Sequence, residues 1–284
     1  MGTLYKLSGA GNDFIVLDGR SGGVDEYRKE VTIRTLCNRN TGFKAADGRV
    51  GADGVMILSS SADGAWDFVM EYFNSDGSSG MMCGNGGRCI VAFADFLGIV
   101  PANGKFYEFL AADGPHTGEI LARKGHSCTV KLKMKDVSEY RRCTDGWFLD
   151  TGTRHFVKFV DDVESVDIAT EGPRYRWSEE FAPIGANVNF VQVLPDGSLK
   201  VRTFEKGVED ETLACGTGIT ASALAAHLEA RRKDASSGTP ASSGTTAKSI
   251  HTAVHARIDE LAVDFTPSGS IFTDVFLTGP ATLI

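Results

Sequence analysis

Hydrophobic and polar residues alternate along many short segments of the chain, which is the pattern of β-strands with one buried face. Residues 66–74 show it clearly, with Phe68, Met70 and Tyr72 at alternate positions. Related apolar patterns predict further strands at 4–7, 14–18, 53–58, 129–134, 147–151, 155–160, 187–194, 200–204, 251–264 and 271–277. The chain is therefore expected to be rich in β-structure.

Three segments follow a helical pattern instead. Residues 24–38 alternate with a helical period, and residues 84–97 are apolar on almost every side, which predicts a buried helix. Residues 217–231 combine large aliphatic side chains with many alanines and predict another helix. The Ser/Gly/Thr-rich segment 234–249 is expected to be an exposed, flexible loop.

An internal repeat connects the two halves of the sequence. The motif Cys83-Gly84-Asn85-Gly86 returns as Cys215-Gly216-Thr217-Gly218, and each copy follows a strand that ends in phenylalanine and precedes a small-residue helix. Residues 11–16 have a looser counterpart in 152–157. This repeat predicts two half-domains of one topology, each with a cysteine at a strand–loop–helix junction.

The expected boundary between the half-domains follows from the positions of the repeated segments. Residues 1–117 form the first half, and residues 278–284 are a candidate segment that returns to it. Residues 118–277 form the second half.

Two cysteines in this context favour acid–base chemistry. The N–H groups and positive end of a helix stabilise a thiolate, and the same groups can bind a carboxylate. If Cys83 and Cys215 faced each other, one could remove the α-proton of an amino acid while the other delivered a proton to the opposite face. Dipoles aimed at the carboxylate would stabilise the enediolate-like intermediate. This chemistry requires no cofactor and no metal, and none is expected.

Composition excludes several other classes of protein. There are 29 Lys and Arg against 37 Asp and Glu, so the net charge of −8 argues against a nucleic-acid partner. No apolar stretch is long enough to span a membrane, and the first residues lack the apolar run of a signal peptide. The six cysteines include no CxxC pair and are too sparse for a disulfide scaffold. A cytoplasmic location is expected.

Several stretches together resemble the diaminopimelate epimerase family. They include KLSGAGNDF at 6–14, MCGNGGRC at 82–89, NVNF at 187–190, ETLACGTG at 211–218 and TGPA at 278–281. They occur in the family's order and span almost the whole chain. The paired cysteine motifs are highly specific, whereas a single CGxG would be a weak signal.

The resemblance implies a fold, a reaction and a set of site residues. The fold is α+β, with two pseudo-symmetric domains, each a mixed barrel-like β-sheet around a central buried helix. The reaction is the cofactor-independent conversion of LL-2,6-diaminopimelate to the meso isomer for lysine and peptidoglycan synthesis, by a homodimer. Cys83 and Cys215 are implied as the acid/base pair, with His155 and Glu205 as auxiliary residues. Substrate contacts are implied for Asn12, Asn74, Gly84, Asn85, Thr153, Asn187, Glu205, Lys206, Gly216 and Thr217.

Two of these positions depart from the family's usual pattern. Thr153 stands where the family usually has asparagine, and Lys206 stands where it often has arginine, so the bidentate grip on a carboxylate is lost. We hypothesise that the neighbouring Arg154 restores part of that grip.

Two alternative functions remain open from the residues. A proline-racemase-like enzyme would also use two cysteines on one carbon. A thiol redox or regulatory binding protein would instead join Cys83 to Cys215 in a switchable disulfide.

Overall fold

The computed structural model describes residues 2–236 and 248–284. It divides into two compact units: unit 1 extends to Lys133 and includes Gly279–Ile284, and unit 2 comprises Met134–Thr278. The division lies later than the boundary expected after residue 117, because the strands between that point and Lys133 pair within the sheet of unit 1. The expected loop 234–249 lies mostly outside the described residues.

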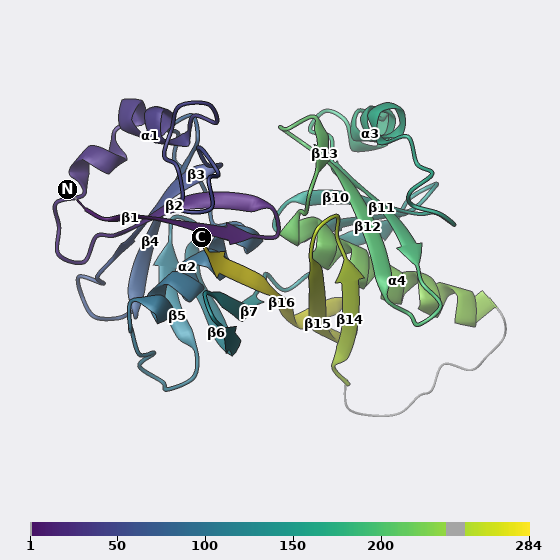
Figure 1. Cartoon of the computed structure of the whole chain (residues 1–284). Coiled ribbons are helices and arrows are strands. Elements are labelled where there is room, and N and C mark those ends of the chain that lie inside the picture. The colour runs from purple at the N-terminus through teal and green to yellow at the C-terminus, as the bar shows by residue number, and fades with distance from the viewer. Residues whose placement is uncertain (1, 237–247) are drawn as a thin grey trace. The chain divides into compact units, whose positions relative to one another are not determined.

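Unit 1 is a mixed sheet that closes on itself (Figure 1). Its strand order is β1-β2-β3-β4-β5-β6-β7, and the end of β16 pairs with both β7 and β1. Only the β2–β3 and β4–β5 pairs among these described strands are parallel. The elements are β1 (Leu4–Gly9), β2 (Asn12–Asp18), η1 (Asp25–Arg28), α1 (Glu30–Cys37), β3 (Gly54–Ser59), β4 (Phe68–Asn74), α2 (Gly84–Phe96), β5 (Tyr107–Ala111), β6 (Gly114–Lys124) and β7 (Ser127–Lys133).

Unit 2 has the strand order β8-β9-β10-β11-β12-β14-β15-β16. A bridge between Val137 and Phe272 connects the segment before β8 to the start of β16, which brings the sheet close to closure. The elements are β8 (Tyr140–Arg142), β9 (Trp147–Asp150), β10 (Arg154–Phe159), α3 (Ile168–Arg176), η2 (Glu179–Phe181), β11 (Asn187–Val193), β12 (Leu199–Glu205), β13 (Asp210–Thr212), α4 (Gly216–Ser236), β14 (Ile250–His255), β15 (Glu260–Ser268) and β16 (Ile271–Leu283).

The two units repeat one plan, element by element. Strands β1 to β4 correspond to β9 to β12, with the same sequence of antiparallel, parallel and antiparallel pairs. Helix α2 follows β4, and α4 follows β12 after the short strand β13. A parallel strand pair comes next in each unit. The internal repeat of the sequence is therefore a repeat of the fold.

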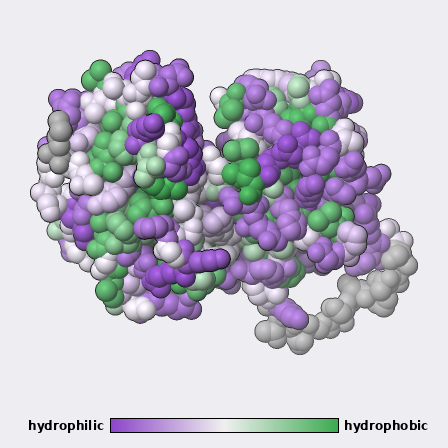
Figure 2. Space-filling view, in the orientation of Figure 1, coloured by the Kyte–Doolittle hydropathy of each residue, from purple (hydrophilic) through white to green (hydrophobic). Residues whose placement is uncertain are grey.

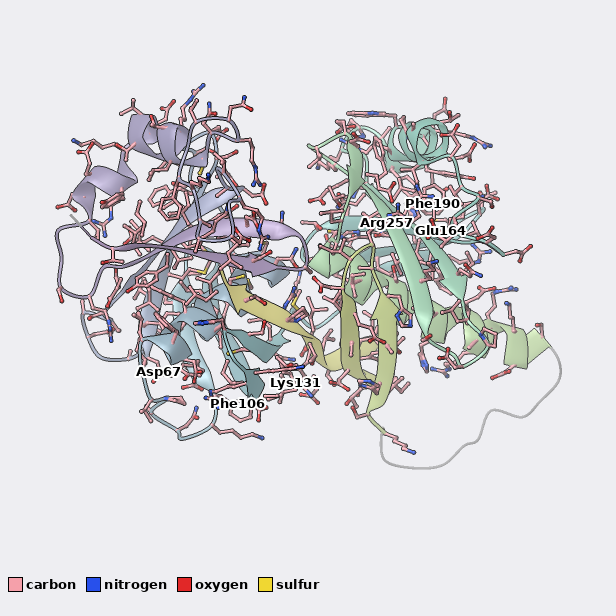
Figure 3. The ribbon with its side chains drawn as sticks, in the orientation of Figure 1. Asp67, Phe106, Lys131, Glu164, Phe190 and Arg257 are labelled. Carbon is pink, nitrogen blue, oxygen red and sulfur yellow. The ribbon has the colours of Figure 1, made fainter. Side chains whose placement is uncertain are left out.

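Most of the buried side chains of each central helix are small or apolar, and the buried Arg88 and Asn85 of α2 are hydrogen-bonded. Residues Gly84 to Ala94 of α2 are all buried, and so is most of the first half of α4. Gly87 leaves room for the Leu132 side chain, because a Cβ atom at this position would come within 2.7 Å of it. In unit 2, aromatic side chains that include Phe190 (Figure 3) fill the space between the sheet and α3. Burial of such side chains stabilises the fold by about 1.5–3 kcal/mol each.

The structure differs from the sequence-based expectation mainly in polar segments. Strands β5, β6, β8 and β13 and helix α3 were not predicted, because charged residues and glycines interrupt their apolar patterns. The single strand expected at 251–264 is a hairpin of β14 and β15, in which Ala256 N donates to Asp259 O across the turn. Near this turn, Arg257 pairs with Glu164 at 2.9 Å (Figure 3).

Polar residues cover much of the face shown in Figure 2, with apolar residues gathered in separate patches. No helix among residues 2–236 and 248–284 is long and apolar enough to cross a membrane. Within the same ranges, no group of three His, Cys, Asp or Glu side chains could hold a metal ion.

Candidate active site

Cys83 occupies the N-cap position of α2. Its backbone is extended, with φ of −115° and ψ of 157°, and its sulfur accepts a hydrogen bond from Gly86 N at 3.3 Å. The Cys83 carbonyl accepts from Gly87 N at 2.8 Å, which begins the helix. The cap places the partly exposed sulfur beside the first N–H groups of the helix, where the helix dipole favours negative charge.

A chain of amide contacts holds the start of α2 against the start of β2. Asn85 Nδ2 donates to Asn12 Oδ1 at 2.6 Å, and Asn12 Nδ2 donates to Asp53 Oδ2 at 3.0 Å. From the other side, Arg88 Nη2 donates to Asn85 Oδ1 at 2.9 Å. Each side-chain amide is thereby fixed in orientation, because its oxygen faces a donor and its nitrogen faces an acceptor.

Arg88 is completely buried, and its guanidinium points back toward the start of its own helix. It donates to Gly84 O at 3.1 Å and to Pro280 O at 3.3 Å, besides Asn85. Pro280 belongs to the last residues of β16, so Arg88 also attaches the C-terminal segment to α2. The cation lowers the pKa of the neighbouring Cys89 thiol, although burial dominates and raises that pKa to about 12.

The remaining expected residue of unit 1 lies at the end of β4. Asn74 Nδ2 donates to Ser78 Oγ at 3.0 Å within the turn that follows. On the same strand, burial and then the charge of Cys83 raise the pKa of the Tyr72 hydroxyl above its usual range. Tyr72 therefore keeps its proton, and its ring packs edge-on against Phe14.

Unit 2 places Cys215 directly before α4, at the position that Cys83 has before α2. The Cys215 carbonyl accepts from Ile219 N at 2.8 Å, and its sulfur lies 3.4 Å from Thr217 Oγ1. Thr217 Oγ1 lies 3.2 Å from Thr153 Oγ1, and the Thr217 carbonyl accepts from Thr151 Oγ1 at 2.9 Å. The start of α4 is thus held to the start of β10, as the start of α2 is held to β2.

His155 lies beneath these two threonines. Its Nε2 is 2.9 Å from both Thr153 Oγ1 and Thr217 Oγ1, and its Nδ1 is 3.0 Å from Asn189 Nδ2. The side chain has no solvent exposure. Burial lowers the pKa of His155 to about 3, so the imidazole is neutral at pH 7.

Asn187, Glu205 and Lys206 lie at one end of the β11–β12 pair. Asn187 Nδ2 donates to Arg154 O at 3.0 Å, and its Oδ1 accepts from Lys206 N at 2.8 Å. Glu205 Oε2 accepts from Thr212 Oγ1 at 2.8 Å on the neighbouring β13. These contacts fix the Asn187 amide and restrain the Glu205 carboxylate.

The Arg154 guanidinium packs against aromatic side chains of unit 2. It lies over the Phe148 ring at 5.2 Å and donates to Phe181 O at 3.4 Å. It therefore packs on the aromatic core, whereas the backbone carbonyl of Arg154 is the atom that meets Asn187. The hypothesis that Arg154 restores part of the carboxylate grip stays a prediction.

The structure brings most of the expected residues together within each unit. Unit 1 connects the Cys83 helix start to Asn12 through Asn85. Unit 2 connects Cys215, Thr217, Thr153 and His155. Four buried or charged partners were not predicted as site residues: Asp53, Arg88, Asn189 and Thr203. Asp53 lies in the stretch GADG at 51–54, directly before β3, whereas Arg88 and Asn189 lie in NGGRC and NVNF. For the last two, a polar residue within an apolar helix or strand was the available signal.

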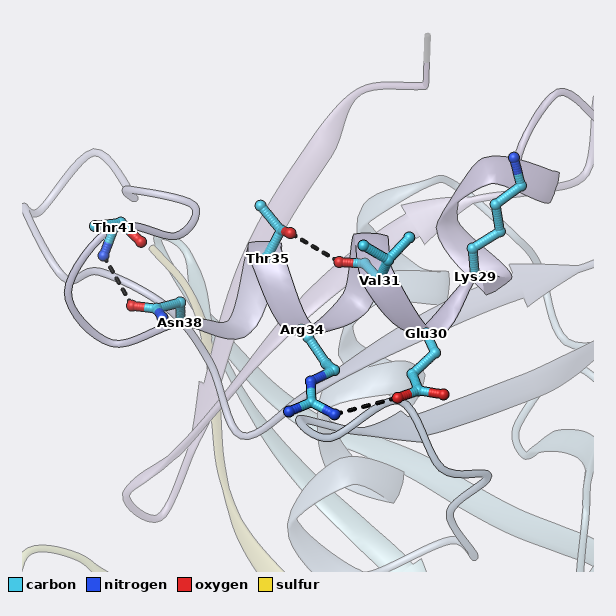
Figure 4. Close-up of a pocket in the computed structure, with 7 residues that line it drawn as sticks. All are labelled: Lys29, Glu30, Val31, Arg34, Thr35, Asn38 and Thr41. Carbon is cyan, nitrogen blue, oxygen red and sulfur yellow. Dashed lines mark hydrogen bonds and ion pairs between the residues drawn. The ribbon is translucent and has the colours of Figure 1, made fainter.

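A surface pocket on α1 contains none of the expected residues (Figure 4). Its lining includes Arg34, which pairs with Glu30 at 3.2 Å, and Thr35, which donates to Val31 O at 2.7 Å. These are ordinary contacts within a surface helix, and the polar networks described above lie elsewhere.

Comparison with known proteins agrees with this arrangement. The family model described as diaminopimelate epimerase matches residues 4–111 and 147–264, which include both cysteine motifs. The chain belongs to the diaminopimelate epimerase family. It is 38% identical over 283 residues to a diaminopimelate epimerase of Flavobacterium psychrophilum, covering 99% of this chain and 97% of that protein.

Solved structures of other proteins share the fold of this diaminopimelate epimerase family member. A Bacillus anthracis phenazine biosynthesis protein of the PhzF family has a TM-score of 0.65 at 11% identity, covering 99% of this chain and 96% of that one. A hydroxyproline epimerase from Agrobacterium vitis has a TM-score of 0.61 at 14% identity, covering 99% and 88%. These likenesses concern the fold alone.

Family membership confirms the resemblance read from the sequence, together with the expected α+β fold and the epimerase reaction class. The proline-racemase-like alternative has only a distant fold similarity in its favour, and nothing supports the redox alternative.

Proposed function

We propose that the chain converts LL-2,6-diaminopimelate to the meso isomer, with Cys83 and Cys215 as the acid/base pair on opposite faces of one α-carbon. The observation that carries this proposal is the equivalent placement of the two sulfurs. Each precedes a buried central helix, and each lies beside a polar group on the helix start. Both positions stabilise a thiolate.

The proton balance of the reaction follows from this pair. One cysteine acts as a thiolate and takes the α-proton, while the other acts as a thiol and gives its proton to the opposite face. The C–H bond on one side breaks as a C–H bond forms on the other. After turnover the two sulfurs have exchanged protonation states, and proton exchange with water restores the first state.

The α-carboxylate becomes enediolate-like as the proton leaves, so its stabilisation controls the rate. The backbone N–H groups at Gly84, Asn85, Gly216 and Thr217 belong to helix starts and are suited to bind a developing negative charge. Neutral His155 adds no positive charge there, and its contacts orient the hydroxyl groups beside it. His155 and Glu205 therefore act as auxiliary residues in this proposal.

Side-chain contacts to the rest of the substrate are assigned to Asn12, Asn74, Thr153, Asn187, Glu205 and Lys206. Most of these groups have fixed orientations, which suits recognition of an amino-acid group with both charges. Thr153 supplies a hydroxyl group instead of an amide, and Lys206 supplies a single cationic centre instead of a fork. A homodimer in the cytoplasm is the proposed working form.

Proton exchange in deuterated water tests this proposal. The purified protein is incubated with LL-diaminopimelate or with L-proline, and loss of the α-proton signal is followed by NMR. We expect exchange and formation of the meso isomer with diaminopimelate and neither with proline. Exchange of proline alone would replace the proposed substrate, and exchange of neither amino acid would contradict the proposal.

A further inference from the structure

A buried polar chain in unit 2 leads from strand β12 to the sulfur of Cys215. Thr203 Oγ1 donates to Asn189 Oδ1 at 3.0 Å, and Asn189 Nδ2 lies 3.0 Å from His155 Nδ1. His155 Nε2 lies 2.9 Å from Thr217 Oγ1, which lies 3.4 Å from Cys215 Sγ. Thr203, Asn189 and His155 are all at least 97% buried, so water does not compete for these contacts.

The orientation of the Asn189 amide is determined by its other two partners. Asn189 Nδ2 also lies 3.2 Å from Phe156 O, and a carbonyl oxygen can only accept a hydrogen bond. The amide nitrogen must therefore face both Phe156 O and His155 Nδ1. The Asn189 oxygen then faces Thr203, whose hydroxyl group can donate to it.

This orientation decides which nitrogen of His155 carries the proton. Because Nδ1 faces an N–H donor, Nδ1 must be the acceptor, and the neutral ring must carry its hydrogen on Nε2. Nε2–H then points at the oxygens of Thr153 and Thr217. With the other tautomer, Nε2 would instead attract the Thr217 hydroxyl hydrogen to itself.

We propose that Thr203 and Asn189 are positioning residues that lock His155 in the Nε2–H tautomer, which leaves the Thr217 hydroxyl hydrogen available to the Cys215 sulfur. Thr217 Oγ1 accepts from Nε2–H and donates to the thiolate. Asn187 Nδ2 donates to Thr153 Oγ1 at 3.4 Å, so the Thr153 oxygen also acts as an acceptor. The inference rests on the proposed role of Cys215, but the arrangement of hydrogens holds whether or not turnover occurs.

The sulfur in unit 1 has a different kind of hydrogen-bond donor. Cys83 Sγ accepts from a backbone N–H group of its helix, which has no alternative direction. In unit 2, the Cys215 sulfur lies 3.4 Å from a hydroxyl group that can turn, and a fixed His155 tautomer determines the direction in which this hydroxyl group donates. Crowding agrees with this fixed arrangement, since a Cβ at Gly218 would come within 2.3 Å of Asn189 Oδ1 and 3.2 Å of His155 Cε1.

The first test observes the tautomer directly. Full-length protein with ¹⁵N-labelled histidine is studied by NMR at pH 7, and the His155 signals are assigned by their loss in His155→Gln. We expect hydrogen on Nε2 in the wild type and on Nδ1 in Asn189→Asp, because a carboxylate can only accept from the ring. Hydrogen on Nδ1 in the wild type would overturn the proposal.

The second test measures the hydrogen bond to sulfur through reaction of Cys215 with iodoacetamide at pH 7, followed by peptide mass spectrometry. Thr217→Val is expected to slow alkylation about threefold or more. Loss of a hydrogen bond to a charged group raises the thiol pKa by about one unit or more, and the higher nucleophilicity of the more basic thiolate offsets about half of this effect. Thr217→Ser keeps the hydroxyl group and should retain the wild-type rate. Equal rates in the valine and serine variants would overturn the proposal.

These readouts separate the two proposals. If the tautomer and alkylation results are as expected but Cys215→Ser remains fully active, the proposed acid/base role of Cys215 fails and the positioning of Thr217 stands. If Cys215→Ser is inactive but the tautomer is the opposite one, the positioning role fails and the proposed function stands.

Discussion

Asn85 donates a hydrogen bond to Asn12 at 2.6 Å, and this contact joins the start of a central helix to the start of a strand. The corresponding groups in unit 2 are Thr217 and Thr153, whose hydroxyl oxygens lie 3.2 Å apart. The same junction is thus built from amides in one unit and from hydroxyl groups in the other. Each junction lies directly beside a cysteine, so its loss should affect both stability and catalysis.

Asn12→Asp tests the amide chain in unit 1. The variant removes the donor to Asp53 and places a second carboxylate 3.0 Å from it. We expect the free energy of unfolding to fall by about 1–3 kcal/mol, since a polar contact becomes a repulsion. Urea unfolding measures this, with Asn40→Asp on an exposed turn as the control. A loss no larger than the control's would show that the chain does not stabilise the helix start.

Arg88→Met tests the buried guanidinium. Three oxygens, from Gly84, Asn85 and Pro280, would each lose a donor, and the first two of these contacts are buried. We expect a loss of about 2–4 kcal/mol in the free energy of unfolding. Arg34→Met is a matched control on exposed α1 and should cost about 0.5 kcal/mol or less. Similar losses in the two variants would contradict the structural role of Arg88.

Stability should depend on pH through His155. Burial lowers its folded-state pKa to about 3, whereas the unfolded chain has the ordinary value of about 6.5. Between these values the unfolded state binds more protons, so stability is full above pH 6.5 and falls as the pH drops toward 3. The expected loss from pH 8 to pH 5 is about 2 kcal/mol.

Unfolding in urea at several pH values measures this loss. His155→Gln should remove the corresponding part of the pH dependence, whereas His251→Gln, a change at an exposed histidine paired with Asp264, should retain it. If the free energy of unfolding depended on pH equally in the wild type and in His155→Gln, this result would contradict a neutral buried imidazole. If His155→Gln does not fold, direct NMR titration of His155 gives the same answer.

The cysteines should separate into two classes on alkylation. Burial raises the pKa of Cys37 to about 11 and of Cys89 to about 12, so both stay protonated and inaccessible at pH 8. Cys83 and Cys215 are partly exposed and lie at helix starts. Brief treatment with iodoacetamide, followed by mass spectrometry, should label these two well before Cys37 and Cys89. Early labelling of Cys89 in the folded protein would contradict its burial.

The sequence predicted the parts of the site that short motifs encode. The two cysteine motifs appear as equivalent helix starts, and strands with clear alternation, such as β4, lie where expected. Partners from distant segments could not be predicted. Arg88 and Pro280 are 192 residues apart, and only the closure of the sheet by β16 brings them together.

Two further features escaped prediction for physical reasons. The sequence pattern of the β14–β15 hairpin predicts one strand, because the alternation of apolar residues continues across its turn. The tautomer of His155 depends on the orientation of the Asn189 amide, which is determined by a carbonyl group on β10. No sequence pattern encodes such an orientation.

The most direct measurement of the central claim is stereospecific proton exchange in Cys83→Ala and Cys215→Ala. Each variant keeps one of the two cysteines of the proposed acid/base pair. Each should therefore exchange the α-proton on one face of the carbon only, and neither should invert the centre. With LL-diaminopimelate and the D-centre of the meso isomer in deuterated water, we expect one variant to exchange only the first and the other only the second. Exchange of the same centre by both variants, or full inversion by either, would contradict two cysteines acting on opposite faces of one carbon.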